Sequence, residues 1–70
     1  MMRDYFSKNL RLLCSYHKSI SEVARQVGMN RQQIMKYLAG TAYPSGRPMR
    51  RLCDFFGVEE YEIIMPDDQF

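Results

Sequence analysis

Residues 19–40 read SISEVARQVGMNRQQIMKYLAG, and this stretch contains two start signals for helices. Ser19 and Glu22 have the spacing of a capping box, in which the serine hydroxyl accepts a hydrogen bond from the Glu22 amide and the Glu22 carboxylate reaches back. Asn30 and Gln33 repeat this pattern further along the chain. The stretch therefore predicts two helices in quick succession.

Three small residues mark the ends of these two helices and the place where they meet. Gly28 and Gly40 follow the two apolar stripes, and glycine adopts the left-handed conformation of a helix C-terminus at little cost. The helices are therefore expected over 20–27 and 31–39. Ala24 has so little side chain that the second helix can lie close to the first. Two short helices joined through a glycine in this way predict a helix-turn-helix unit.

The rest of the chain carries further helix signals and no alternation with the period of two that a strand requires. A first helix is expected over 5–16 with Asp4 as its N-cap, and residues 41–48 are expected to form a loop. Pro48 lies in the first turn of a fourth helix, where its missing amide hydrogen is harmless, and a short fifth helix is expected over 58–65. The expected core residues are Phe6, Leu10, Leu13, Cys14, Ile20, Val23, Ala24, Val27, Ile34, Tyr37, Leu38, Met49, Leu52, Cys53, Phe56, Tyr61 and Ile64. The sequence therefore predicts an all-α fold of five helices.

Charge is divided unevenly along the chain. Residues 3–51 hold all ten Lys and Arg with two acidic residues, a net charge of +8, whereas residues 52–70 hold six acidic residues and no Lys or Arg. The basic part suits a polyanion such as DNA, because each cation that meets a phosphate releases condensed counterions. An ordinary solvated surface explains the charge equally well. The acidic part is expected to point away from any nucleic acid.

The length and composition of the chain limit the number of domains and the cellular location that it can have. Seventy residues allow one core, so residues 1–70 are expected to be a single domain, either complete or the N-terminal part of a longer protein. A run of about 18 apolar residues is absent, and the start of the chain lacks the apolar stretch of a signal peptide. The sequence therefore favours a cytoplasmic protein.

Side chains capable of catalysis or metal binding are few. Cys14 and Cys53 lie among apolar neighbours and are expected to be buried free thiols. Zinc requires four ligands and only His17 joins the two cysteines, so no metal and no other cofactor is expected. The sequence has no Ser, His and Asp arrangement and no phosphate-binding glycine loop, so an enzyme is not expected.

Residues 19–58 resemble the Cro and phage-repressor family, the Xre type of helix-turn-helix protein. The matching residues are Ser19-x-x-Glu22-Val23-Ala24, Val27-Gly28-Met29-Asn30-Arg31-Gln32-Gln33-Ile34, Tyr37-x-x-Gly40 and Leu52-Cys53-x-x-Phe56-Gly57-Val58. The resemblance implies a five-helix, lambda-repressor-like domain whose third helix enters the major groove of double-stranded DNA, usually as one half of a dimer on a two-fold operator. It also implies a bacterial or phage transcriptional regulator that acts in the cytoplasm, at the nucleoid.

Two positions depart from the family pattern. The family commonly has Gln at the first position of the second helix, where it holds a DNA phosphate, and this chain has Ile20. The family also tends to pair a Glu of the third helix with an Arg of the first helix, and the position of the Glu is Leu38 here. The expected partner position, Leu13 or Cys14, is apolar too. We therefore expect a hydrophobic contact in place of the ion pair.

The outward face of the third helix is expected to meet DNA bases, because its apolar residues turn the opposite face inward. The outward residues are Arg31, Gln32, Met35 and Lys36. Arginine offers two donors to guanine O6 and N7, glutamine matches adenine, lysine donates to guanine or phosphate, and methionine can rest on a thymine methyl. Gln33 is a further base-reading candidate, although its capping role alone accounts for it. A solvated polar helix face is the alternative interpretation.

Phosphate contacts are expected around this helix, because such bonds set the register on DNA without reading sequence. Ser19 or Ser21 would take the place of the missing glutamine. The other candidates are Asn30, Tyr43, Ser45 and Arg47. Arg50 and Arg51 either bind phosphate or are solvated beside the core.

The adjacent pair Phe55 and Phe56 suggests a partner surface. When Phe56 faces the core, Phe55 points about 100° away and is expected to be partly exposed, together with Ile63 or Met65. One recognition helix reaches about three or four base pairs, so useful specificity normally requires a second copy. We therefore expect a homodimer formed through the fourth and fifth helices.

The alternative function is a protein-interaction module, such as an antitoxin or adaptor domain, whose third helix binds no DNA.

Overall fold

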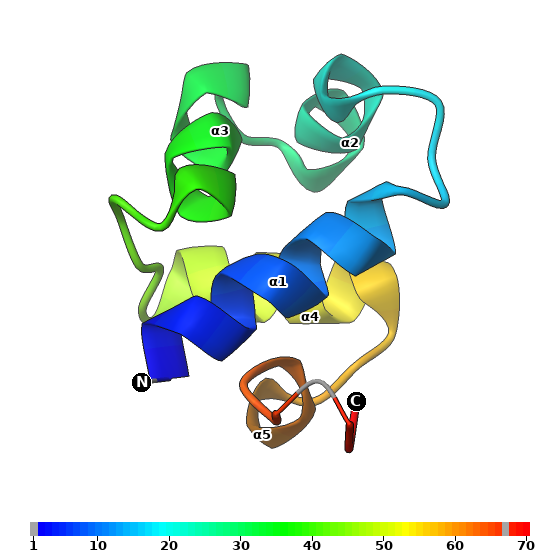
Figure 1. Cartoon of the computed structure of the whole chain (residues 1–70). Helices are drawn as coiled ribbons and strands as arrows, with labels where there is room; N and C mark the ends of the chain where they lie inside the picture. Colours follow the sequence, from blue (N-terminus) through cyan, green and yellow to red (C-terminus); the bar gives the residue numbers. More distant parts are fainter. Residues whose placement is uncertain (1, 67) are drawn as a thin grey trace.

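The computed structural model describes residues 2–66 and 68–70, with side chains from Tyr5 onward, and this part of the chain contains five helices and no strand. The helices are α1 (Met2–Cys14), α2 (Ile20–Val27), α3 (Arg31–Ala39), α4 (Arg47–Phe56) and α5 (Glu60–Ile63). Helices α2 and α3 lie on one side of α1, and α5 lies on the other (Figure 1). Helix α1 packs against α3 and α5, and α2 packs against α3 and α4. The structure therefore confirms the all-α fold.

Every helix contributes a fully buried side chain to one core. The six largest of these side chains are Phe6, Leu10, Val23, Ile34, Leu52 and Ile63. Leu13, Ile20, Leu38 and Phe56 are half-buried against this core, as the apolar stripes predicted. Cys14 and Cys53 are buried free thiols, which also agrees with the sequence. Within the described residues, no helix has the length and apolar character needed to span a membrane.

Helix α1 begins and ends earlier than the sequence suggested. It starts at Met2, so Asp4 lies inside the helix and is not its N-cap; the side chain of Asp4 lies outside the described residues. Methionine and arginine favour helix, which is consistent with the early start. After Cys14 the chain tightens into a turn, in which the amides of Tyr16 and His17 donate to the carbonyl oxygens three residues earlier. The Ser15 hydroxyl also donates to the carbonyl oxygen of Leu12 there.

The expectation for the last helix was wrong in length and in orientation. Helix α5 covers a single turn, and its start is fixed by a capping box between Glu59 and Glu62. Ile63 is fully buried and Tyr61 is 63 % exposed, the reverse of the expected arrangement. Ile64 is half-buried, in partial agreement with the sequence. A helix of one turn contains too few residues for its apolar spacing to define an inward face.

A buried asparagine in α1 accounts for the observed orientation of α5. The side-chain amide of Asn9 donates to the carbonyl oxygens of Ile63 and Met65, both at 2.8 Å. Asn9 is 2 % exposed, so its amide requires partners inside the protein. These two bonds hold the C-terminal end of α5 and the residues after it against α1, and they direct Ile63 into the core.

Candidate nucleic-acid interface

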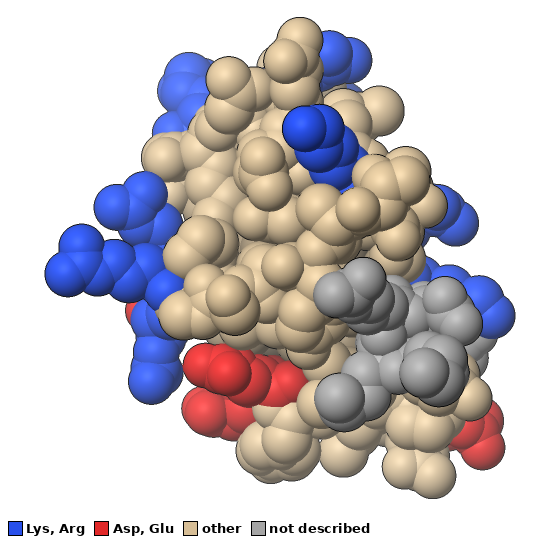
Figure 2. Space-filling model, turned by 90° about the vertical axis from the view of Figure 1, so that its left-hand side faces the viewer, with Lys and Arg blue, Asp and Glu red and all other residues tan. Residues whose placement is uncertain are grey.

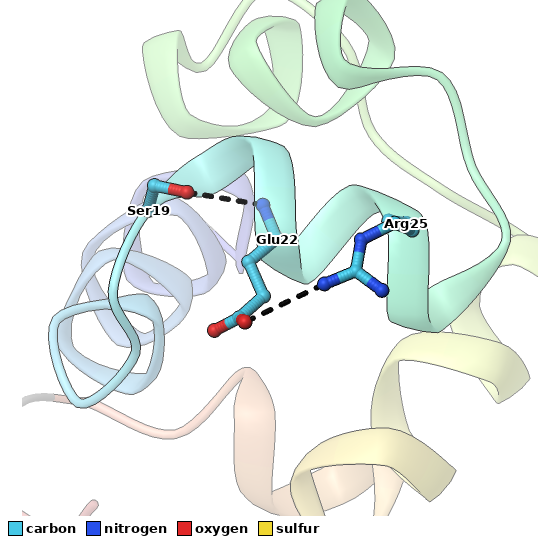
Figure 3. Close-up of polar contacts among 3 residues, drawn as sticks. All are labelled: Ser19, Glu22 and Arg25. Atoms are coloured by element: carbon cyan, nitrogen blue, oxygen red, sulfur yellow. Dashed lines mark hydrogen bonds and ion pairs between the residues drawn. The ribbon is translucent and has the colours of Figure 1, made fainter.

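The start of α2 is capped as the sequence predicted, but only one half of the capping box is formed. The Ser19 hydroxyl accepts a hydrogen bond from the Glu22 amide at 3.1 Å. The Glu22 carboxylate lies 3.5 Å from the Arg25 guanidinium instead of reaching back to Ser19 (Figure 3). Glu22 is one of the two acidic residues in the basic part of the chain, and Arg25 offsets its charge within the same helix.

The turn between α2 and α3 is short, and local hydrogen bonds shape both of its ends. Gly28 has a φ of 83°, and the amides of Gly28 and Met29 both donate to the carbonyl oxygen of Ala24 at 2.9 Å. The side chain of Asn30 then accepts a hydrogen bond from the Gln32 amide at 2.7 Å and caps α3. The reciprocal bond expected from the side chain of Gln33 is not formed among these described residues. The helix-turn-helix unit itself is confirmed.

Helix α3 is fixed to the core through its inner face. Ile34 is fully buried and Tyr37 is 2 % exposed. The buried Ser7 hydroxyl of α1 donates to the Tyr37 carbonyl oxygen at 2.8 Å. Because this inner face cannot rotate outward without breaking those contacts, the opposite face of α3 is held toward solvent.

The first and third helices are joined by a polar bond that the sequence interpretation missed. Leu38 is half-buried against the core, in line with the expected hydrophobic packing. In addition, the Arg11 guanidinium donates to the Leu38 carbonyl oxygen at 2.8 Å. The chain thus retains an arginine link between α1 and α3, with a backbone carbonyl as the acceptor.

The structure brings the five base-reading candidates together on one helix. All five are exposed, including the side chain of Met35, which is 42 % exposed: Arg31, Gln32, Gln33, Met35 and Lys36. Helix α3 has no acidic residue. Its outward face therefore offers hydrogen-bond donors, amides and one apolar side chain without an opposing negative charge.

All the candidates for phosphate binding except Tyr43 lie at or next to the start of a helix. Ser19 and Ser21 are exposed beside the start of α2, Asn30 is exposed at the start of α3, and Ser45 and Arg47 are exposed at the start of α4. Helix starts suit anions because their first amides lack partners within the helix. The hydroxyl of Ser19 and the side-chain oxygen of Asn30 already accept capping bonds from their own helices.

Tyr43 differs from the other phosphate candidates because part of its ring belongs to the core. It is half-buried, and its ring packs edge-on against Phe6 with 5.3 Å between the ring centres. The loop therefore uses Tyr43 to anchor itself to α1. This anchoring role was not apparent from the sequence, where Tyr43 stands among turn-forming residues.

A hollow of about 430 Å³ opens between the starts of α3 and α4. The residues that line it are Met29, Asn30, Gln33, Tyr37, Arg47, Pro48 and Arg51. One guanidinium nitrogen of Arg51 donates to the Gly28 carbonyl oxygen at 3.2 Å, so this side chain contacts the turn itself. The sequence left Arg51 as either a phosphate ligand or a solvated residue and did not predict this bond.

The two ends of the molecule differ in charge. On the face drawn in Figure 2, Lys and Arg lie over the upper part, which is the side of α2 and α3, and along the middle of both edges, whereas most of the acidic residues lie in the lower part, toward α5. This arrangement agrees with the division of charge along the sequence. An anion approaching the α3 side meets an excess of positive charge.

The remaining reactive side chains have packing roles. His17 lies against the rings of Phe55 and Phe56, with 5.1 and 5.7 Å between ring centres. Burial raises the pKa of the Cys14 thiol from 9.0 to about 11. No group of three or more His, Cys, Asp or Glu within the described residues has the arrangement of a metal site.

Comparison with known proteins identifies the family. A model of the Cro/C1-type HTH DNA-binding domain matches residues 10–69, which include the helix-turn-helix unit and all or part of every helix. Searches of curated proteins and of solved structures gave no significant match. Because the family match covers most of the 70 residues, the chain belongs to the Cro/C1-type helix-turn-helix family of DNA-binding domains.

Proposed function

We propose that this protein is a transcriptional regulator that binds specific sequences of double-stranded DNA by placing α3 in the major groove. The observation that carries the proposal is the orientation of α3, whose inner residues Ile34 and Tyr37 are buried while its outward residues are exposed. The family match supports DNA binding. The reading of bases and the regulation of transcription go beyond that match.

The chemistry of α3 suits the edges of DNA bases. Arg31 and Gln32 lie in the first turn, the part of a recognition helix that usually contacts base edges. Arginine can donate two bonds to guanine, and glutamine can exchange two bonds with adenine. Lys36 and Met35 would extend the contact along the groove, the lysine to guanine or phosphate and the methionine to a thymine methyl. Gln33 is the fifth proposed base-reading residue.

The surrounding side chains would hold the DNA backbone. We assign phosphate contacts to Ser19, Ser21, Asn30, Tyr43, Ser45 and Arg47. The strongest of these assignments is Arg47, because it is exposed at the start of α4 and lines the hollow next to α3. A cation there would attract the phosphates that flank a major groove occupied by α3.

A second copy of the chain is part of this proposal, since one α3 reads too few base pairs for useful specificity. We place the contact between copies at α4 and α5. Tyr61 of α5 is 63 % exposed, and Met65 lines a hollow with Leu12 of α1 and with Tyr16, which follows that helix. Phe55 of α4 is half-buried, and His17 packs against its ring.

Titrations of labelled duplex DNA at several salt concentrations test the proposed function. Arg31→Ala should weaken binding to a preferred duplex by about 1 to 3 kcal/mol and reduce the preference over unrelated DNA. Arg47→Ala should weaken binding to all sequences alike and lower the slope of log affinity against log salt by about one. A chain that binds no duplex, or that binds it with no dependence on salt, would favour the protein-interaction function instead.

A further inference from the structure

We propose that Arg51 is a positioning residue of the DNA interface, which holds the turn between α2 and α3 and does not itself bind a phosphate. The inference rests on the proposed function of α3. It concerns a residue on α4, outside the helix-turn-helix unit. Its role would be to set the position from which the first turn of α3 meets DNA.

The contact between Arg51 and the turn is direct. A guanidinium nitrogen, Nη1, lies 3.2 Å from the carbonyl oxygen of Gly28 and donates to it. A Cβ atom built on Gly28 would lie 3.7 Å from the same nitrogen, which is ordinary van der Waals distance. The guanidinium therefore lies against the glycine at which the chain turns from α2 into α3.

The acceptor of this bond is a group that the turn does not satisfy by itself. The amides of Gly28 and Met29 donate back to Ala24, but the Gly28 carbonyl lies beyond the end of α2 and has no helical donor. The C-terminus of a helix carries partial negative charge, so a guanidinium there is favoured by both charge and hydrogen bonding. Asn30, the N-cap of α3, follows the glycine by two residues.

Helix α3 is thereby held at both ends by side chains that donate to backbone carbonyls. At its C-terminal end, Ser7 donates to Tyr37 and Arg11 donates to Leu38, both from α1. At its N-terminal end, the corresponding link is made through the turn by Arg51 of α4. The first turn of α3 carries the proposed base-reading residues, so movement of this end would misplace them directly.

Arg47 provides the comparison within the same hollow. Both arginines line it, but Arg47 makes no side-chain hydrogen bond or ion pair with the described residues, whereas Arg51 is engaged with the turn. Arg47 is therefore available to a phosphate. The two side chains should differ in how their loss affects the salt dependence of DNA binding.

Amide hydrogen exchange in the free protein tests the contact without DNA. In Arg51→Ala, the amides of Met29 and Gln32 should exchange about threefold faster than in the wild type, relative to the core amide of Leu10. Arg51→Lys keeps a donor and should restore most of the protection. Arg50→Ala removes the same charge from the neighbouring position of α4 and should leave these amides unchanged. Unaltered exchange in Arg51→Ala would overturn the proposal.

Salt titrations of DNA binding test the functional consequence. Arg51→Ala should weaken binding about threefold at every salt concentration and leave the salt slope unchanged, while Arg47→Ala should lower the slope by about one. If Arg51→Ala lowers the slope of log affinity against log salt concentration by about one, the proposal is overturned, because Arg51 would then be a phosphate ligand. Absence of DNA binding by the wild type would instead refute the proposed function, and the exchange measurement would still decide whether Arg51 holds the turn.

Discussion

The two thiols illustrate how burial changes the chemistry of a single residue. Cys14 is 5 % exposed, and burial raises its pKa to about 11. The pKa of Cys53 is raised too, first by burial and then by the negative charges of Glu60 and Asp54. Both side chains are therefore neutral thiols at neutral pH, and neither is poised for nucleophilic chemistry.

We predict that both thiols react slowly with an aromatic disulfide reagent at neutral pH and rapidly once the chain is unfolded, because the thiolate is the reactive form. The folded pKa of Cys14 lies above the unfolded value of 9.0, so its contribution to the free energy of unfolding is present below 9.0 and is lost as the pH rises through about 11. Cys14→Ala should therefore show a shallower alkaline loss of stability than the wild type. Equal slopes, or fast reaction of the folded protein, would contradict this prediction.

Hydrogen bonds between residues close in the sequence can be predicted from it, whereas those between distant residues cannot. The capping bonds of Ser19 and Asn30 reach amides three and two residues away, so both bonds could be predicted from the spacing of residue types in the sequence. Ser7, Asn9 and Arg51 donate to carbonyls 30, 54 and 23 residues away. Every residue has a carbonyl, so no residue type marks these acceptors in the sequence.

At the scale of elements, the start of α2 depends on a single hydroxyl. Ser19→Ala should lower the free energy of unfolding by about 1 kcal/mol, because the Glu22 amide loses its acceptor. Chemical denaturation measures this change. Ser21→Ala is the matched control on the same helix and should change stability by less than about 0.5 kcal/mol. Equal losses in both variants would show that the cap has no special role.

The length of a helix decides how well its orientation can be predicted. Helices α2 and α3 have enough turns for their apolar residues to define an inner face, and Val23, Ile34 and Tyr37 are buried as expected. In α5, the exposed Tyr61 and the buried Ile63 exchange their expected places. That orientation is set by the tertiary bonds of Asn9, which lies on another helix.

At the scale of the whole molecule, charge and shape favour one direction of approach to DNA. The basic side includes α2 and α3, and the acidic residues lie toward α5 (Figure 2). The outward face of α3 was predictable, because its opposite face is an apolar stripe. The hollow between α3 and α4 was not, since it depends on how the loop at Tyr43 returns the chain to the core.

In the proposed dimer, the contact through α4 and α5 would have to set the two copies side by side, so that both α3 helices face the same DNA duplex. Two copies of α3 related by two-fold symmetry would read two half-sites about 34 Å apart, or a multiple of that distance. The preferred DNA should then contain an inverted repeat. This symmetry is a property of the assembly and cannot arise from a single copy of the chain.

Selection of bound sequences from a pool of random duplex DNA, carried out in parallel with the wild type and Arg31→Ala, tests the central claim most directly. The claim is that the exposed face of α3 reads base pairs. It predicts that the wild type enriches one sequence with two inverted half-sites, and that Arg31→Ala loses the preference at one position of each half-site. Enrichment of no sequence, or of the same sequence by both proteins, would contradict it.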